Sequence, residues 1–241
     1  MKSKQSFVVY RGPSALDGET IRVVLTRGSA NRKTGDMAQL FIVRDDKAPH
    51  LAQKDGTDAS VCGDCPFRPA NGGGCYVVTI QGPRAMFKAS EGRAVDLEGA
   101  RAFLAARAIE SGKRAVLRLG AYGDPAAVPE HILRTLVAAV DGRATGYTHQ
   151  WRRPEFAFLR EMCMASVESQ RDTLVAWNRG WRTFRVTPND ATVLPKEIVC
   201  VNESRGVSCE DCGLCFGGLA AKSITIPAHG FTVKRALGSL S

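Results

Sequence analysis

Several features that assign a function at once are absent from this sequence of 241 residues. No apolar run approaches the roughly 20 residues that span a bilayer, and no apolar signal segment follows Lys2 and Lys4. The run Gly72-Gly73-Gly74 has neither the lysine nor the register of a phosphate-binding loop, and no Gly-x-Ser-x-Gly nucleophile turn occurs. We therefore expect a protein of the cytoplasm without a membrane partner, and no P-loop or serine-hydrolase chemistry.

Acidic residues are outnumbered, which leaves a formal net charge of +9. An excess of positive charge favours an acidic partner, either a nucleic acid or a phosphorylated small molecule. The basic residues are scattered, with small groups at Arg152-Arg153 and Lys234-Arg235. A solvated surface without a binding role is therefore the alternative.

What the sequence does contain is eight cysteines, seven of which fall into two groups. The first group is Cys62, Cys65 and Cys75, and the second is Cys200, Cys209, Cys212 and Cys215. Thiolates are soft ligands, and a Cys-x2-Cys pair presents two sulfurs to one metal from a single turn. A disulfide framework is the alternative, but it is typical of small secreted domains, whereas this chain is 44% hydrophobic and long enough to bury a core. We expect both groups to bind metal. Cys163, between Met162 and Met164, is expected to pack as a small apolar residue.

The two groups predict different metal sites. Three cysteines leave one iron of a [4Fe–4S] cluster open for chemistry, whereas four saturate it. The second group contains the Cys-x2-Cys-x2-Cys run of bacterial ferredoxins, and Cys200 supplies a fourth thiolate. Zinc is the alternative for both groups, with His50 as the fourth ligand of the first.

The pattern of apolar residues predicts strands that alternate with helices. Helices are expected at residues 97–110, closed by Gly112, from Pro129 to residue 140, and from Ser169 to Gly180. The expected strands are residues 38–43, 115–119, 144–148, 161–167, 181–186, 197–201 and 223–226. This order predicts an α/β fold with a partial or closed parallel (β/α) barrel, and a doubly wound open sheet is the alternative.

The same pattern divides the chain into three parts. Residues 1–36 are expected to form a short β-rich N-terminal extension, with strands near 8–10 and 21–25. Residues 37–204 form the barrel core with the first cysteine loop, and residues 205–241 form a cysteine-rich C-terminal segment with the last strand.

Polar residues follow several of the predicted strands. They are Asp124 with Gly120 and Gly123, His149, Ser166 with Glu168, and Glu203. Active sites of parallel barrels are built by the loops that follow the strands, so these residues are expected to share one face of the molecule. Each of them, taken alone, is also explained as a cap, a turn or a buried polar residue with local partners.

These features resemble the radical S-adenosylmethionine superfamily. The similarity covers residues 38–204 and rests on a cysteine loop after the first barrel strand, the turn Gly120-Ala121-Tyr122-Gly123-Asp124-Pro125, and Ser166 on the fourth strand. The early cysteine trio with a late Cys-x2-Cys-x2-Cys is also similar to phage-encoded proteins that have no assigned activity.

The resemblance implies roles for individual residues. Cys62, Cys65 and Cys75 would hold a [4Fe–4S] cluster whose free iron binds the amino and carboxylate groups of S-adenosylmethionine. The turn with Gly120, Gly123 and Asp124 would contact the amino group, and Tyr76 follows the last cluster ligand. Ser166 and Glu168 would contact the ribose and the carboxylate.

Two functions are therefore expected as alternatives. The first is an iron–sulfur enzyme of the radical S-adenosylmethionine type that acts on a nucleotide or nucleic acid and uses a reducing electron donor. Asp124, His149 and Glu203 are its candidate catalytic residues, and the second cysteine group holds a further cluster. The second function is a zinc-stabilised protein that binds nucleic acid without catalysis.

Overall fold

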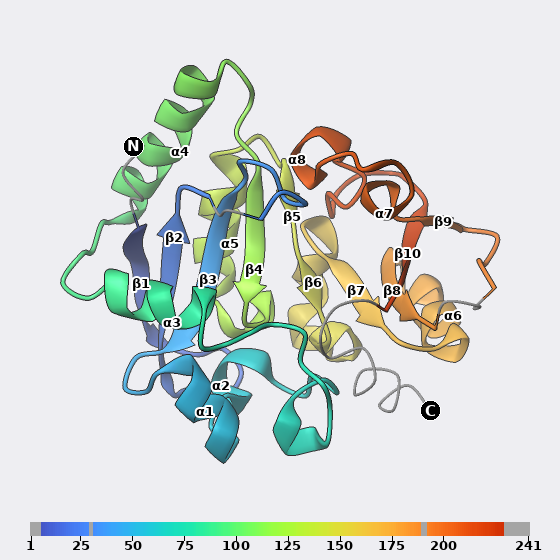
Figure 1. Ribbon diagram of the computed structural model, residues 1–241, viewed down its shortest axis with the longest axis horizontal. Helices are drawn as coiled ribbons and strands as arrows, with labels where there is room; N and C mark the ends of the chain where they lie inside the picture. The colour runs from blue at the N-terminus through green and yellow to red at the C-terminus, as the bar shows by residue number, and fades with distance from the viewer. Residues whose placement is uncertain (1–5, 29–30, 189–191, 229–241) are drawn as a thin grey trace.

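The computed structural model of the chain describes residues 6–28, 31–188 and 192–228 (Figure 1). These residues form two five-stranded sheets, with the strand orders β1-β2-β3-β4-β5 and β6-β7-β8-β10-β9. The strands are β1 (Ser6–Pro13), β2 (Thr20–Thr26), β3 (Ala38–Arg44), β4 (Leu117–Tyr122), β5 (Ala144–Thr145), β6 (Tyr147–Thr148), β7 (Met164–Val167), β8 (Thr183–Thr187), β9 (Glu197–Val199) and β10 (Ser223–Pro227).

Helices and short 3-10 turns connect the strands. The helices are α1 (Pro49–Asp55), α2 (Ala59–Cys62), α3 (Gly82–Ala89), α4 (Leu97–Ser111), α5 (Glu130–Ala138), α6 (Gln170–Asn178), α7 (Val201–Arg205) and α8 (Cys209–Cys212). The 3-10 turns are η1 (Pro69–Asn71), η2 (Pro125–Ala127), η3 (Gln150–Arg152) and η4 (Pro154–Glu161). Within the described ranges, none of the helices has the length and apolar character to cross a bilayer.

Most neighbouring strands run parallel. Among the strands of the described residues, only the pairs β1–β2 and β2–β3 are antiparallel, and the pairs from β3 to β5 and from β6 to β9 are parallel. The predicted mixed α/β fold with parallel strands is confirmed, and closure of the two sheets into a barrel is not shown. A single residue, Gly146, separates β5 from β6, so the two sheets follow each other directly. The last two strands do not follow their sequence order in the sheet, because β10 lies between β8 and β9.

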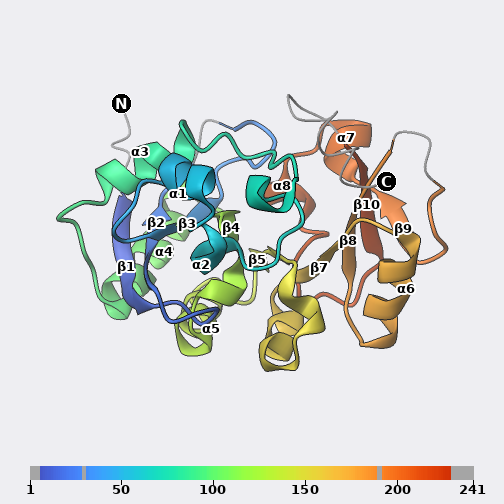
Figure 2. The ribbon, with the colours of Figure 1, turned by 90° about the horizontal axis from the view of Figure 1, so that it is seen from below.

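The centre of the first sheet explains why its strands form. All residues of β3 are buried, as are all but the first of β2, which is the pattern of strands covered on both faces. Figure 2 shows α1 and α3 on one side of these strands and α5 on the other. The buried face of α5 consists of Ile132, Leu133 and Leu136, at the spacing expected for one side of a helix.

The ends of the helices follow local signals in the sequence. Asp96 begins α4 by accepting a hydrogen bond from the Gly99 backbone N–H at 2.8 Å, and Gly112 ends it with a φ of 63°. Ser169 begins α6 by accepting from the backbone N–H of Asp172 at 3.0 Å. The predicted strand 161–167 is shorter than expected, because η4 occupies the chain up to Glu161 and β7 begins at Met164.

The N-terminal strands and the strand of the C-terminal segment are themselves part of the two sheets. Strands β1 and β2 continue the first sheet beyond β3, and β10 lies inside the second. The loop after β2 also reaches α8, where the Cys209 backbone N–H donates to the Lys33 carbonyl at 2.8 Å. Cys163 is 1% exposed and packs in the core, as expected. Residues 229–241 of the predicted C-terminal segment lie outside the described residues.

Candidate metal centre and pocket

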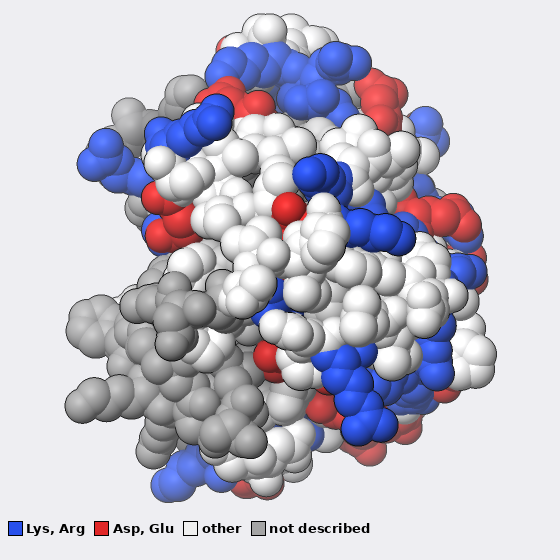
Figure 3. Space-filling view, turned by 90° about the vertical axis from the view of Figure 1, so that its right-hand side faces the viewer, with Lys and Arg blue, Asp and Glu red and all other residues white. Residues whose placement is uncertain are grey.

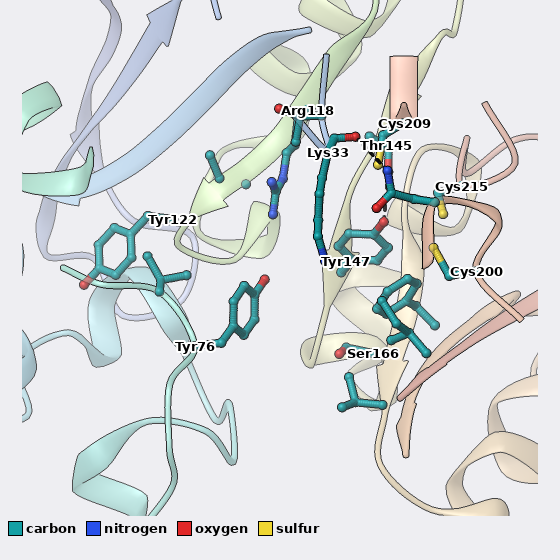
Figure 4. Close-up of a pocket in the computed structure, with 18 of the residues that line it drawn as sticks. Lys33, Tyr76, Arg118, Tyr122, Thr145, Tyr147, Ser166, Cys200, Cys209 and Cys215 are labelled. Atoms are coloured by element: carbon teal, nitrogen blue, oxygen red, sulfur yellow. Dashed lines mark hydrogen bonds between the residues drawn. The ribbon is translucent and has the colours of Figure 1, made fainter. Parts of the chain in front are cut away.

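A cavity of about 370 Å³ is lined by residues from both sheets (Figure 4). All seven cysteines of the two groups line it, although they lie more than a hundred residues apart in the sequence. All eight cysteines are within the described residues, and all are free thiols. The fold therefore brings both cysteine groups to one site.

Strands of both sheets contribute to the wall of the pocket. Arg118, Gly120, Ala121 and Tyr122 of β4 line it, as do Phe184 and Val186 of β8. The two residues of β8 are alternate residues, and successive side chains of a strand point to opposite faces. The intervening residues of β8 are buried on the other face. The pocket therefore lies along the strand faces as well as at the strand ends where the sequence placed the site.

The first cysteine group surrounds the end of α2. Cys62 is the last residue of this helix, and Cys65 and Cys75 follow in the loop. Burial raises the pKa of the Cys62 thiol well above its usual value, and the nearby Cys65 and Cys75 raise it further. Burial also raises the pKa of Cys75, to about 11. The three thiols are thus close enough to influence one another's charge, and metal binding would have to displace their protons.

Arg68 holds this loop in place from within it. Its Nε and Nη2 atoms donate to Asp58 Oδ1 at 3.0 and 2.7 Å, and both side chains are buried. Its Nη1 atom donates to the Gly63 carbonyl at 3.1 Å, and Nη2 also donates to the Gly56 carbonyl at 2.7 Å. One guanidinium therefore joins the segments before, between and after the first two cysteines.

The second cysteine group lies around α7 and α8. Cys200 directly precedes α7, Cys209 and Cys212 are the first and last residues of α8, and Cys215 follows in the next turn. Burial raises the pKa of the Cys215 thiol to about 12, a hydrogen bond from Tyr147 lowers it, and the other three thiols of the group raise it. All four thiols therefore lie within electrostatic reach of one another.

Arg182 holds the second loop through backbone carbonyls alone. Its Nη1 atom donates to Phe216 at 2.6 Å, its Nη2 atom to Leu214 and Lys222 at 2.6 and 2.7 Å, and its Nε atom to Ala221 at 3.0 Å. The residue directly precedes β8, which anchors it in the second sheet. It therefore fixes the path of the chain on both sides of the last cysteine.

The residues present fit a thiolate-bound metal in their chemistry, although no metal group is assembled. In the part of the chain that the structure describes, no three His, Cys, Asp or Glu side chains stand in a metal-binding arrangement. Buried polar atoms without partners do lie near the first group, namely the Tyr122 hydroxyl and both side-chain atoms of the Gln150 amide. A Cβ added to Gly63, next to Cys62, would be 2.4 Å from Gln150 Nε2. Donors at this position suit a cluster, whose sulfurs accept hydrogen bonds.

Asp124 lies at the pocket, but its carboxylate is engaged by the backbone. Oδ1 accepts from the Ala126 N–H and Oδ2 from the His149 N–H, both at 2.9 Å. Burial raises the pKa of this carboxyl, and the two backbone hydrogen bonds act in the opposite direction. Asp124 therefore caps η2 and ties the end of β4 to the end of β6, whereas the cap of α5 is Pro129.

Gly120 and Gly123 line the pocket, and their conformation has a local cause. Gly123 has a φ of 84°, in the region that favours glycine, and a Cβ there would be 2.7 Å from that of Ile42. A Cβ at Gly120 would be 2.5 Å from the Gly123 carbonyl oxygen. Both glycines are therefore required by the packing of the turn.

His149 and Glu168 form a pair beside the first cysteine group. His149 Nε2 is 2.9 Å from Glu168 Oε1, and both side chains are 16% exposed. Burial alone would lower the pKa of His149, but Cys65 and Glu168 together raise it well above its usual value. His149 lines the pocket, whereas Glu168 is not among the lining residues. The hydrogen-bonded pair therefore lies next to Cys65 at the edge of the pocket.

The other predicted residues differ in their exposure and in whether their side chains form hydrogen bonds or ion pairs. Glu203, on α7, lines the pocket and forms an ion pair with Lys33. The Ser166 hydroxyl forms no hydrogen bond with a described residue and lines the same pocket. Tyr76 is 60% exposed, and Figure 4 shows its ring directed toward the centre of the pocket. His50, the proposed zinc ligand, lies on α1 and is not among the residues of the pocket wall.

Several residues of this site were not predicted from the sequence, among them Arg118, Tyr147 and Arg182. Arg118 and Tyr147 line the pocket, and Arg182 supports it. A signal was available for Arg118, because it is a charged residue inside the apolar run of β4. None was available for Arg182, whose partners lie more than thirty residues away along the chain.

The chain was also compared with known proteins. It matches no protein-family model, no curated protein and no solved structure.

Proposed function

We propose that this protein is an iron–sulfur enzyme of the radical S-adenosylmethionine type that acts on a nucleotide or nucleic acid. The observation that carries the proposal is the convergence of two distant cysteine groups on one pocket. Cys62, Cys65 and Cys75 would hold a cluster with one open iron, and the second group would hold a saturated cluster that accepts electrons from a reducing donor.

The pocket residues support this proposal through their chemistry. A cluster held by three thiolates would supply an open coordination position and one-electron chemistry. Ser166 offers a free hydroxyl at the same pocket, together with the exposed ring of Tyr76. His149 and Glu168 are joined by a hydrogen bond beside Cys65. Asp124 fixes the position of His149 through its backbone, so its role in this account is to position rather than to bind the cofactor.

The strands around the pocket are those of a partial (β/α) barrel in this proposal. The parallel strands β3, β4, β5 with β6, β7 and β8 follow one another in sequence and in space. Residues of β4, β6, β7 and β8, among them Arg118, Ser166 and Phe184, line a common cavity, as interior residues of a barrel do. The antiparallel strands β1 and β2 then extend one edge of the barrel.

One observation favours the alternative of a zinc-stabilised protein that binds nucleic acid. The second group has four thiols within reach of one another, which is the ligand number of structural zinc. The surface gives this alternative less support. On the face drawn in Figure 3, Lys and Arg side chains gather in separate groups with acidic and uncharged residues between them. A continuous basic track would be expected for a protein that only binds nucleic acid.

Metal analysis tests the proposal. Protein purified without oxygen should contain iron and acid-labile sulfide and absorb broadly near the roughly 400 nm typical of thiolate-bound clusters. A colourless protein with stoichiometric zinc and no sulfide would support the alternative and contradict the enzyme.

A further inference from the structure

The pocket contains a cationic side chain without an ionic partner. Arg118 is half-buried on β4, and its guanidinium forms no hydrogen bond or ion pair with any described residue. Its Nε atom is fully buried without a partner. Figure 4 shows the guanidinium directed into the pocket, toward the side on which Tyr76 lies, with the Lys33 side chain drawn between Arg118 and Tyr147.

The carboxylates of the pocket are engaged elsewhere. Asp124 accepts from two backbone N–H groups, and Glu203 pairs with Lys33. Removing a guanidinium from water without a hydrogen-bond partner is unfavourable, so such a group is typically completed by an anion. The planar fork of arginine matches the oxygens of a phosphate especially well.

Aromatic rings stand beside this cation. Tyr147 and Phe184 pack against each other in a tilted arrangement with ring centroids 4.3 Å apart, and both line the pocket, as do Tyr76 and Phe216. Aromatic side chains of this kind stack on nucleobases in other proteins. The pocket thus offers a charged contact and apolar ring contacts within one cavity.

We propose that this pocket binds a 5′-mononucleotide, with its phosphate on Arg118 and its base against the aromatic rings. The proposal rests on the proposed function, since it names the substrate class of that site. A cavity of about 370 Å³ falls at the small end of the range for single small-molecule ligands. Its size therefore favours one nucleotide over a polynucleotide strand.

Binding experiments on the full chain test this assignment. Each of the four 5′-mononucleotides would be titrated calorimetrically into protein purified without oxygen, alongside uridine, inorganic phosphate and a short single-stranded oligonucleotide. At least one mononucleotide should bind more tightly than uridine and more tightly than phosphate, because only it uses both contacts. Binding of none of the four, or tighter binding of the oligonucleotide, would overturn the assignment.

Two variants localise the phosphate contact. Arg118→Gln should weaken binding of the mononucleotide by about 10- to 100-fold, the effect of losing a hydrogen bond to a charged group, and leave uridine binding unchanged. Arg153→Gln is the control: Arg153 is also half-buried and stacks on an aromatic ring, that of Phe156, but neither residue lines the pocket. The control should bind like the wild type. Equal losses in both variants would contradict the assignment.

The metal content of the same samples separates this inference from the proposed function. Arg118 lies near Cys209, where its charge lowers the pKa of the thiol, so it could instead balance the second cysteine group. In that case Arg118→Gln would lose metal together with nucleotide binding, which would overturn the assignment. Nucleotide binding that depends on Arg118 in a protein without iron would uphold the pocket and contradict only the iron–sulfur enzyme.

Discussion

Each cysteine group is organised by one arginine side chain. Arg68 binds a buried carboxylate and two carbonyls around the first group, and Arg182 binds four carbonyls around the second. Each arginine links chain segments on both sides of a cysteine and thereby holds the cysteine loop in its conformation. The two groups are therefore held by the protein itself as well as by any metal they bind.

Removing Arg68 should be strongly destabilising. Arg68→Met leaves Asp58, 2% exposed, without its ionic partner, and breaking such a buried pair costs about 3–5 kcal/mol. Urea unfolding of the metal-free protein measures the change. Arg134→Met, at an exposed ion pair with Glu161, is the control and should leave the free energy of unfolding nearly unchanged. Similar stabilities of the two variants would show that Arg68 does not hold the loop.

Asp124 is the residue for which the structure alters the expectation most. Asp and Asn are equally good caps, so the sequence alone predicts that Asp124→Asn is neutral for stability. In the structure each carboxylate oxygen accepts a different backbone N–H, and an amide can satisfy only one of them. Asp124→Asn should therefore lower the free energy of unfolding by about 1–3 kcal/mol, the cost of one unsatisfied buried donor.

Asp96→Asn provides the comparison for this measurement. Asp96 caps α4 through a single hydrogen bond from Gly99, which an amide oxygen can replace. Its stability in urea should match that of the wild type. If Asp124→Asn is equally stable, the carboxylate is not needed to join the ends of β4 and β6, and its charge is then available to a ligand.

Among the elements, the strands and helices with strong local signals were predictable, and their arrangement was less so. The apolar run of β3 and the stop at Gly112 after α4 identify both elements from the sequence. The insertion of β10 between β8 and β9 has no local signal, because it depends on pairing between distant segments. The antiparallel pairs β1–β2 and β2–β3 join consecutive strands, but no local signal showed that these strands continue the sheet of β3 and β4.

The loop from Gly213 to Lys222 should depend on Arg182. Arg182→Gln removes charge-assisted hydrogen bonds to four carbonyls, so local opening of this loop should become easier by about 1.5–3 kcal/mol. Hydrogen exchange read by mass spectrometry should show faster exchange there and no change around Arg68. Arg179→Gln, an exposed arginine with one carbonyl contact, should change neither region. Faster exchange throughout the molecule would contradict a local role.

At the scale of the whole molecule, the fold brings two cysteine groups that are distant in the sequence to one pocket. Spacing alone identified two cysteine groups and several polar residues, including His149 and Ser166, that line the pocket. It did not show that both groups face the same cavity, because the residues that line this cavity come from both sheets and from distant parts of the chain. The account therefore depends on one claim, namely that two separate metal sites flank a single pocket.

Metal analysis of two cysteine-depleted proteins tests this claim most directly. One protein would lack the thiols of Cys62, Cys65 and Cys75, and the other those of Cys209, Cys212 and Cys215, with each residue replaced by Ala. After purification without oxygen, each should retain the iron and sulfide of the untouched group and lose those of the other, with the wild type containing both. If either set of substitutions removes all the iron, the two-site account is wrong. It is also wrong if the wild type and both cysteine-depleted proteins contain no iron.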